Sequence, residues 1–324
     1  LYAPELGFYV RGGGAGRRRD FLTSPEVGPL FGRVVARALD EWWDRLERPD
    51  PFVVVEAGAG PGTLARSILA AAPACRGALH LVLVEPGEVQ WATHPGGVTS
   101  RADLPAPGEL GHGPCVVLAN ELLDNLPFSL VERTAHGWSD VRVTVGPRGF
   151  VEVLEPLPAD QARWCDARTH GDAAPGARLP IQADAAGWLA EALRLAAGGR
   201  VVVVDYASDS ADLSQRPWAE WVRTYAAQGR AGNPLADPGK CDVTCEVAVD
   251  QLSLVRSPDI DEDQAAFLRA HGLDDLVAEG AARWKAEGSA GGLAAIAGRS
   301  RVHEADALTD PAGLGAFRVL EWIG

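Results

Sequence analysis

Three glycines at alternate positions, Gly58, Gly60 and Gly62, follow an apolar run that ends in the carboxylate Glu56. The run, residues 52–55, lacks alternation of polar and apolar side chains, which is typical of a strand covered on both faces in a parallel sheet. Glycines let the backbone turn sharply and approach a ligand, and a helix starting after them directs its amide groups and positive dipole end at that ligand. The pattern predicts a nucleotide-type site.

The glycine turn is compatible with three roles. Its spacing differs from the dinucleotide fingerprint G-x-G-x-x-G/A, which needs a small residue at Thr63, so NAD is disfavoured but not excluded. An acidic residue two positions before the first glycine is the form associated with S-adenosylmethionine (SAM), a cationic ligand that tolerates nearby carboxylates. The third role is a strand-to-helix connection without a ligand. If the ligand is SAM, the candidate contacts are Glu56, Gly58, Gly60, Gly62 and Thr63.

A second apolar run, residues 79–84, ends in Glu85, which lies 23 residues beyond Gly62. This is about where the acidic ribose-binding residue of a βαβ nucleotide site belongs, so Glu85 is the predicted ribose ligand. Asp103, after a weaker third strand, could accept a hydrogen bond from an adenine amino group. Solvated strand ends would explain both carboxylates without a ligand.

Polar side chains also follow a predicted strand at residues 114–119. Asn120, Glu121 and Asp124 come directly after it and are the candidate catalytic residues, and Asn120 is also a candidate cofactor contact. A capped strand-to-helix turn is the alternative explanation for these three residues.

A helix is expected to start at Ser24 as its N-cap, with Pro25 as the first helical residue and Glu26 in the first turn. Apolar residues then recur at helical spacing as far as residue 43. Thr23, Ser24 and Glu26 are candidates to close over the cofactor, although helix capping explains them equally well.

Composition excludes several classes of protein. The chain has 324 residues, 47% of them hydrophobic, and a net charge of −14, which permits a sizeable core and argues against a nucleic-acid-binding surface. No apolar run is long enough to span a membrane and no export signal is visible, so the expected location is the cytoplasm. The five scattered cysteines are expected to be reduced, and no ligand pattern predicts a metal.

Strands that alternate with helices predict a doubly wound α/β sheet, whose ligands bind beyond the carboxyl ends of the strands. The expected organisation is an N-terminal loop and helix over the cofactor site (1–48), a core (49–206) with a β-hairpin insertion (about 128–155), a substrate-side excursion (207–295) and C-terminal strands (296–324). The core helix is expected at 183–197, a fifth strand at 200–206, two further helices at 262–271 and 273–287, and an edge strand at 316–323.

Taken together, the motifs resemble the MidA-like SAM-dependent methyltransferases, a family with bacterial members and a mitochondrial complex I assembly factor. The resemblance spans nearly the whole chain. It rests on Leu1-Tyr2-x-Pro4-x-x-Gly7-Phe8-Tyr9, Asp20-Phe21-x-Thr23-Ser24-Pro25-Glu26, the glycine turn with Glu56, Asn120-Glu121-x-x-Asp124-x-Leu126-Pro127, and Asp205-Tyr206. Departures are Ala119, Leu122-Leu123 and Ala207, where the family has Gly, an aromatic pair and Gly. Family members begin with an earlier helix, which implies truncation at the N-terminus.

The resemblance implies a class I SAM-methyltransferase fold, SAM as cofactor, and a protein arginine substrate converted to symmetric dimethylarginine. A planar cation is gripped well by carboxylates, so Glu121 and Asp124 would hold the arginine and Asn120 would orient them or contact SAM.

The alternatives are a methyltransferase for a small metabolite enclosed by the tryptophans of the excursion, an NAD-linked oxidoreductase, and a non-catalytic assembly factor that retains the fold. Neither nucleic acid nor membrane is an expected partner. The basic run at 17–19 is expected to be a solvated loop. The oligomeric state is left open, with a homodimer as one option.

Overall fold

The computed structural model describes residues 1, 7–9, 23–226, 229–230, 232–236, 238–287 and 292–324. Parts of the N-terminal motifs therefore lie outside the described residues, namely Tyr2, Pro4, Asp20 and Phe21. The same holds for the basic run at 17–19.

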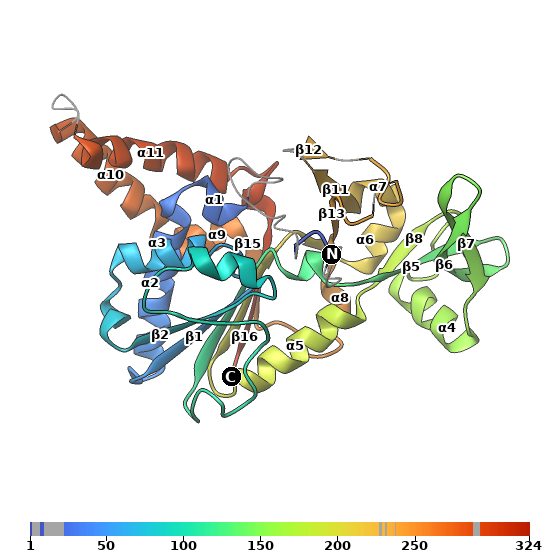
Figure 1. The fold of residues 1–324 in the computed structure, drawn as a ribbon, viewed down its shortest axis with the longest axis horizontal. Helices are drawn as coiled ribbons and strands as arrows, with labels where there is room; N and C mark the ends of the chain where they lie inside the picture. The colour runs from blue at the N-terminus through green and yellow to red at the C-terminus, as the bar shows by residue number, and fades with distance from the viewer. Residues whose placement is uncertain (2–6, 10–22, 227–228, 231, 237, 288–291) are drawn as a thin grey trace.

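A seven-stranded sheet forms the centre of the molecule, in the order β15-β16-β9-β4-β1-β2-β3 (Figure 1). Its strands are β1 (Phe52–Ala57), β2 (Leu79–Val84), β3 (Thr99–Arg101), β4 (Cys115–Asn120), β9 (Arg200–Asp205), β15 (Ile260–Asp263) and β16 (Arg318–Ile323). The five neighbouring strands β9, β4, β1, β2 and β3 run parallel to one another. Strand β16 is antiparallel to both of its neighbours, β9 and β15. This arrangement confirms the predicted doubly wound α/β sheet of the class I methyltransferase type.

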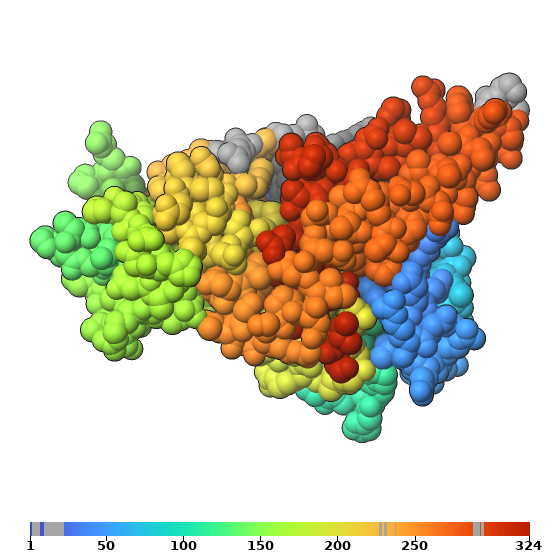
Figure 2. Space-filling view, turned by 180° about the vertical axis from the view of Figure 1, so that it is seen from behind, coloured from blue at the N-terminus to red at the C-terminus, as the bar shows by residue number. Residues whose placement is uncertain are grey.

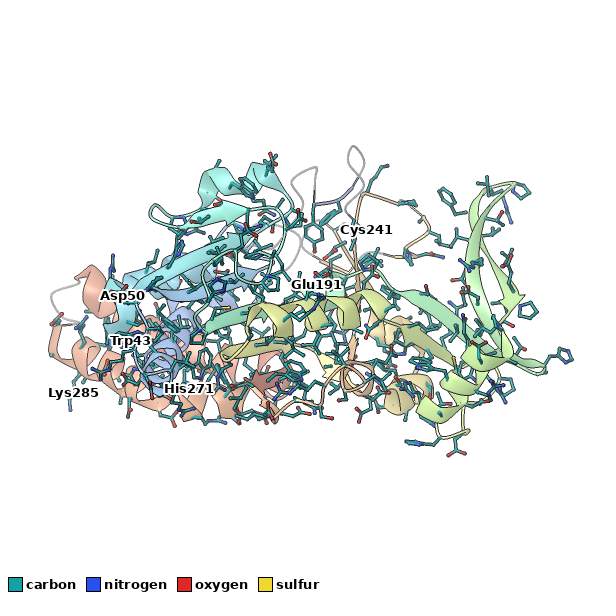
Figure 3. All side chains as sticks on the ribbon, turned by 90° about the horizontal axis from the view of Figure 1, so that it is seen from below. Trp43, Asp50, Glu191, Cys241, His271 and Lys285 are labelled. Carbon is teal, nitrogen blue, oxygen red and sulfur yellow. The ribbon has the colours of Figure 1, made fainter. Side chains whose placement is uncertain are left out.

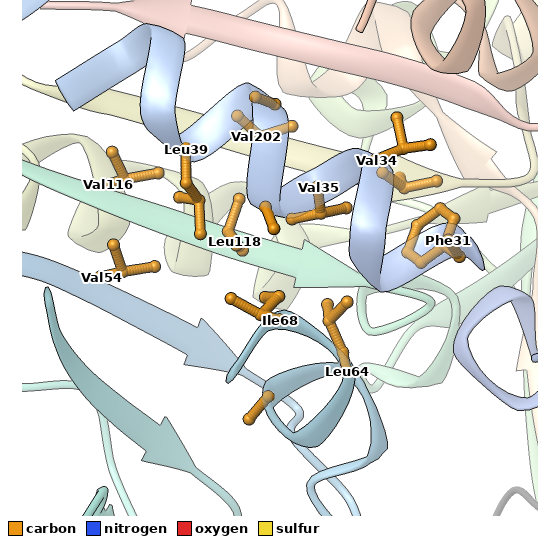
Figure 4. Close-up of a cluster of buried hydrophobic side chains, with 14 of the residues drawn as sticks. Phe31, Val34, Val35, Leu39, Val54, Leu64, Ile68, Val116, Leu118 and Val202 are labelled. Carbon is orange, nitrogen blue, oxygen red and sulfur yellow. The ribbon is translucent and has the colours of Figure 1, made fainter. Parts of the chain in front are cut away.

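Helices cover both faces of this sheet. On one face, α2 (Pro29–Arg45) and α3 (Thr63–Ala71) pack on β1, β4 and β9 through the apolar cluster of Figure 4. On the other face, α5 (Ala183–Leu195) packs on alternate residues of the same strands. All residues of β1 and β9 are buried, which explains the unbroken apolar runs in the sequence. The carboxyl ends of these strands are therefore held rigidly.

The predicted N-terminal helix is two helices. A short helix, α1 (Ser24–Val27), is separated from α2 by Gly28. The prediction that Ser24 is the N-cap was wrong, because Thr23 occupies that position and Ser24 is already helical. The break follows from Pro29, which disfavours a helical conformation at the preceding residue and starts a new helix. Glu304 accepts a hydrogen bond from the backbone N–H of Leu30 in the first turn of α2 (2.9 Å).

The predicted hairpin insertion forms a separate four-stranded sheet in the order β7-β6-β5-β8, which we call the arm (residues 128–181). It consists of β5 (Ser129–Thr134), β6 (Gly137–Gly146), β7 (Gly149–Pro156), α4 (Ala159–Arg168) and β8 (Arg178–Ile181). Seen from behind, the arm is at one end of the molecule, and the pair α10 (Leu273–Glu287) and α11 (Leu293–Leu308) is at the other (Figure 2).

The excursion after β9 contains short elements that lie over the carboxyl edge of the central sheet. They are β10 (Ala207–Ser208), α6 (Ser210–Gln215), α7 (Trp218–Trp221), β11 (Val222–Ala226), β12 (Gly229–Arg230), β13 (Asp242–Cys245), β14 (Val247–Ala248) and α8 (Val249–Leu252). The three-stranded sheet β12-β11-β13 and a small apolar cluster around Trp221 hold them together.

The C-terminal third differs from its prediction in three respects. First, β15 and α9 (Gln264–Ala270), expected in the excursion, belong to the central sheet and its core. Second, the region expected to form C-terminal strands contains the long helix α11 and only one strand, β16. Third, β16 is an interior strand between β9 and β15, so the expected edge strand is wrong and β15 is the edge. Among the described helices, none has the length and apolar character needed to cross a membrane.

Replacing Gly199 with alanine should destabilise the fold strongly. A Cβ atom there would lie 1.9 Å from the carbonyl oxygen of Cys115, where β4 and β9 begin, so the strands must separate. We expect a loss of about 1–3 kcal/mol or more, as for other overpacked cores. Gly187→Ala in α5 is the matched control, because no atom lies within 4 Å of its added Cβ. It should be neutral or stabilising, and equal denaturation midpoints for the two variants would contradict this packing.

Candidate active site

A cavity of about 450 Å³ lies at the carboxyl edge of the central sheet, within the range typical of small-molecule sites. The loops after β1, β2 and β4 form its floor, and Tyr9, α1 and α5 form its sides. Of the predicted residues, the cavity is lined by Thr23, Glu26, Glu56, Gly58, Gly60, Thr63, Glu85, Asp103, Asn120 and Glu121. Ser24, Gly62 and Asp124 do not line it.

The glycine turn has the backbone conformation that its sequence predicts. Gly58 and Gly60 have φ angles of 69° and 49°, in the left-handed region that favours glycine. At Gly58 a Cβ atom would also lie 2.9 Å from the Cδ1 atom of Leu122, so the next loop closes directly over the turn. Gly62 caps the N-terminus of α3 and supports the turn without touching the cavity.

His94 braces the glycine turn from outside the cavity, and it belongs to no motif from which this role could be predicted. Its Nε2 atom lies 2.9 Å from the carbonyl oxygen of Gly60, and its Nδ1 atom lies 2.7 Å from the hydroxyl of Ser100. A carbonyl oxygen can only accept a hydrogen bond, so Nε2 is the donor to Gly60. His94 thereby ties the turn to β3.

Glu56 is a buried carboxylate with an unsatisfied oxygen. It lines the cavity, and its Oε2 atom has no hydrogen-bond partner among the described residues. Burial raises its pKa from 4.5 to about 8, against smaller lowering effects from the Ala65 backbone and Arg66. Because the pKa of Glu56 is higher in the folded state than in the unfolded state, its contribution to the stability of the fold is fully present below pH 4.5. That contribution is lost as the pH rises through about 8. A ligand cation at Oε2 would reverse that effect.

Glu85 both lines the cavity and holds its loops in place. Its two carboxylate oxygens accept hydrogen bonds from the backbone N–H groups of Gly60 (3.0 Å) and Gly87 (2.7 Å). Burial raises the pKa of Glu85, and these two bonds partly oppose the rise. Glu85 and Asp103 both line the cavity, and their predicted contacts with a ribose and with an adenine stay predictions.

The N-terminal motif meets the core through hydrogen bonds at the cavity wall. Glu26 accepts a 2.6 Å hydrogen bond from the hydroxyl of Thr63. Ser24 turns its hydroxyl away from the cavity to Gln264 (2.8 Å), while its backbone N–H donates to Glu121 (3.0 Å). The structure therefore gives Ser24 a supporting position, which corrects the expectation that its side chain faces the cofactor.

Glu121 is the acidic residue at the floor of the cavity. Its φ of 52° is rare for a residue with a side chain and indicates local strain. The Oε1 atom accepts from Ser24 N–H and from the Asn120 side-chain amide (3.1 Å). Burial raises the pKa of Glu121 to about 7. The Oδ1 atom of Asn120 is buried without a partner among the described residues, so a second acceptor lines the cavity unsatisfied.

Asp124, predicted to grip a substrate beside Glu121, lies behind the cavity wall. Its carboxylate accepts hydrogen bonds from Tyr206 (2.6 Å) and Asn125 (2.8 Å). Burial is the largest cause that raises its pKa to about 7, and the charge of Glu121 adds to it. Asp205 is buried beside it and accepts from the backbone N–H groups of Leu123 and Asp124. Both aspartates support the Glu121 loop and do not contact a cavity ligand directly.

The sequence did not identify three further residues at the cavity. Trp188 and Glu191 project from one face of α5, three residues apart (Glu191 in Figure 3). Tyr9 lines the opposite side, and its hydroxyl lies 2.9 Å from Asn125 and 3.0 Å from Asp242. Trp188 and Glu191 belong to no sequence motif, and Tyr9 belongs to the N-terminal motif but was not predicted to be a site residue.

The charge of the cavity indicates the class of ligand. Six acidic residues line it, and none of the described lining residues is basic. A pyrophosphate would be repelled, whereas the ammonium and sulfonium groups of SAM are cations, and its amino and hydroxyl groups are donors. The unpaired acceptors of Glu56, Asn120 and Gln90 match those donors. Fold and site together define a SAM-dependent enzyme.

Comparisons with known proteins identify the family. The family model described as "Putative S-adenosyl-L-methionine-dependent methyltransferase" matches residues 34–258, and the chain belongs to this family. A solved structure of a COG1565 superfamily member and "likely methyl transferase" from Burkholderia thailandensis, bound to S-adenosyl-homocysteine, matches with a TM-score of 0.82 and 27% identity. It covers 100% of this chain and 85% of that one.

The chain is also similar to curated vertebrate proteins. The proteins named "Protein arginine methyltransferase NDUFAF7, mitochondrial" are 26% identical in Danio rerio over 317 residues and 27% identical in Mus musculus over 318 residues. Both matches cover 85% of this chain, and they cover 71% and 69% of the relatives.

SAM is therefore the cofactor, and it supplies the methyl group for transfer. Glu56, Asn120 and Gln90 provide free acceptors to hold it, and the glycine turn braced by Glu85 and His94 shapes its site. Within the described part of the chain no three His, Cys, Asp or Glu side chains gather as a metal site would require.

Binding of S-adenosylhomocysteine should tighten as the pH rises toward 8. The ligand ammonium pairs best with ionised Glu56, whose pKa is raised to about 8, so at lower pH binding must displace a proton. Glu56→Gln cannot ionise and should bind more weakly near pH 8 and with a flatter pH dependence. Equilibrium dialysis with labelled ligand measures this, with Glu191→Gln at the exposed rim as control. A Glu56→Gln variant that keeps the wild-type pH slope would contradict the assignment.

His94→Ala should weaken S-adenosylhomocysteine binding by roughly 2- to 10-fold, the usual value of one lost hydrogen bond. The reason is that the carbonyl of Gly60 loses its donor and the turn becomes mobile. His80→Ala is the matched control, because His80 contacts Thr99 at the far end of β2 and β3. Equal affinities of the two variants would show that His94 does not position the turn.

Proposed function

We propose that this methyltransferase acts on the side chain of arginine in a protein and forms symmetric dimethylarginine. The observation that carries the proposal is Glu121, a carboxylate on the cavity floor whose pKa is raised to about 7 by burial. A guanidinium would supply the missing positive charge, and its planar N–H groups suit a carboxylate.

The reaction needs alignment and a place for one proton. A bond forms between a terminal nitrogen and the methyl carbon, the bond from sulfur to that carbon breaks, and the nitrogen loses a proton. Alignment alone contributes up to about 7–11 kcal/mol in favourable cases. Glu121 can orient the nitrogen, and a pKa near neutrality suits it to accept the proton. Ser24 and Asn120 hold its Oε1 atom, which leaves Oε2 for the substrate.

The relatives support the same substrate class. The similar vertebrate proteins are named protein arginine methyltransferases, and the match covers 85% of this chain. The identity of 26–27% supports the substrate class as a proposal, and the particular target protein is unassigned.

The alternative of an apolar metabolite loses its main argument in the structure. That alternative relied on tryptophans of the excursion enclosing a substrate. Trp221 is fully buried in a separate apolar cluster, and Trp218 packs its ring against the guanidinium of Arg178. Neither lines the cavity.

The direct test is incubation of the enzyme with methyl-labelled SAM and a soluble extract, followed by hydrolysis and amino-acid analysis. The proposal expects label in symmetric dimethylarginine of a protein. Label confined to small molecules would establish the metabolite alternative. If the enzyme binds the cofactor but transfers no label, and cells nevertheless require the protein, it would be a non-catalytic assembly factor.

Glu121→Gln should lower methyl transfer by about 10- to 100-fold, the loss expected for a hydrogen bond to a charged group. The amide keeps an acceptor for Ser24 and Asn120 but cannot carry the charge or accept the proton. Binding of S-adenosylhomocysteine should change little. Glu191→Gln, also a lining carboxylate but exposed, should retain activity. Full activity of Glu121→Gln would exclude this residue as the substrate carboxylate.

A further inference from the structure

β7 is an edge strand whose outer side meets no described segment of the chain. It ends the order β7-β6-β5-β8, and each of its eight residues is exposed. The backbone N–H of Leu157 donates to Trp138 of β6, and bonding to β6 alternates along the strand. The backbone N–H and C=O groups of Val151 and Val153 therefore bond to β6. Those of Phe150, Glu152 and Leu154 point away from β6, toward the open edge. Unpaired edges of this kind readily take up another strand.

Of the two charges on β7 that could deter another strand, Glu152 is neutralised within the arm by a two-pronged contact with Arg178 (3.0 and 2.6 Å). Glu155 lies 3.9 Å from Arg142, which pairs more closely with Asp140 (2.7 Å). The remaining side chains on the outward-bonding positions are apolar, with Phe150 48% and Leu154 44% exposed. They continue onto Val143 and Val145 of β6, on the same face of the sheet.

The charge of the arm favours a second copy of this chain as the occupant. The whole chain carries −14, so two copies repel one another over most of their surfaces. Residues 128–181, by contrast, contain six arginines and seven acidic residues, and are nearly neutral. The arm also projects from one end of the molecule, so two arms can meet without the bodies approaching (Figures 1 and 2).

Symmetry and charge select one register for that contact. A two-fold axis through Glu152 would place the two copies of this carboxylate opposite each other, which is unfavourable. An axis at Val153 instead places Glu152 opposite Leu154, Glu155 opposite Val151 and Phe150 opposite Pro156. Every outward N–H group from Phe150 to Leu154 then faces the other strand, and the interface closes on itself as two-fold contacts do.

We propose that two copies of this protein associate through antiparallel pairing of β7 with β7, centred on Val153, to form one continuous eight-stranded sheet from the two arms. The pairing leaves both cavities free, and it is independent of which substrate the enzyme methylates.

Light scattering after size-exclusion chromatography tests the association. The wild-type protein should have twice the mass of the chain, and Leu154→Glu should be monomeric, because the new carboxylate faces Glu152 of the other copy. Leu254→Glu, at a 60% exposed leucine outside the arm, is the matched control and should remain dimeric. A monomeric wild type, or a dimeric Leu154→Glu that still binds S-adenosylhomocysteine, would overturn the proposal.

Cysteine cross-linking tests the register without perturbing the contact. Two directly opposite residues of a non-hydrogen-bonded antiparallel pair lie about 4.5 Å apart at their Cα atoms, within the range of a disulfide. Val153→Cys should therefore give a covalent dimer on mild oxidation, whereas Val151→Cys, equally exposed two residues away, should not. All five native cysteines are buried and should not interfere. Failure of Val153→Cys to cross-link, or equal cross-linking of both variants, would overturn the proposed pairing.

Discussion

The central constraint in this structure is the burial of carboxylates at the ends of parallel strands, where burial outweighs every favourable interaction with the described residues. Parallel pairing of β1, β4 and β9 brings their carboxyl ends to one edge, and Glu56, Glu121 and Asp205 follow at that edge. Removing a carboxylate from water disfavours its charge, so the pKa of each is raised. The protein thus holds acidic groups that gain stability only when a ligand brings positive charge. A cationic cofactor satisfies this need, and the arginine substrate that we propose would do so as well.

The surrounding backbone is arranged to hold these groups in place. Gly60 and Gly87 donate to Glu85, Ser24 donates to Glu121, and the backbone after β4 donates to Asp205. Each bond links a carboxylate to a loop that also shapes the cavity, so the glycine turn, α1 and the loop after β4 depend on one another. Backbone donors orient a carboxylate without neutralising it, which leaves its charge available to the ligand.

The strands and the cofactor loop could be predicted from the sequence, because unbroken apolar runs followed by an acidic residue or glycines allow few alternatives. The contacts made by single side chains could not. Ser24 and Asp124 stand in informative motifs, yet their side chains face Gln264 and Tyr206, since the direction of a side chain after a strand depends on tertiary packing. His94 and Trp188 lie in segments without a motif and reach the site only through the fold. The interior position of β16 could not be predicted, because an apolar segment indicates a strand but does not indicate which strands lie beside it.

The most direct test of this account is the exchange of protons when S-adenosylhomocysteine binds. Titration calorimetry near neutral pH, in buffers with different ionisation enthalpies, counts the protons released or taken up. If Glu56, whose buried carboxyl group has a pKa of about 8, gains the ligand ammonium as its partner, it must ionise, and binding should release protons to the buffer. Binding without net proton exchange, or with proton uptake, would contradict the claim that the cavity is an acidic site completed by the charge of its ligand.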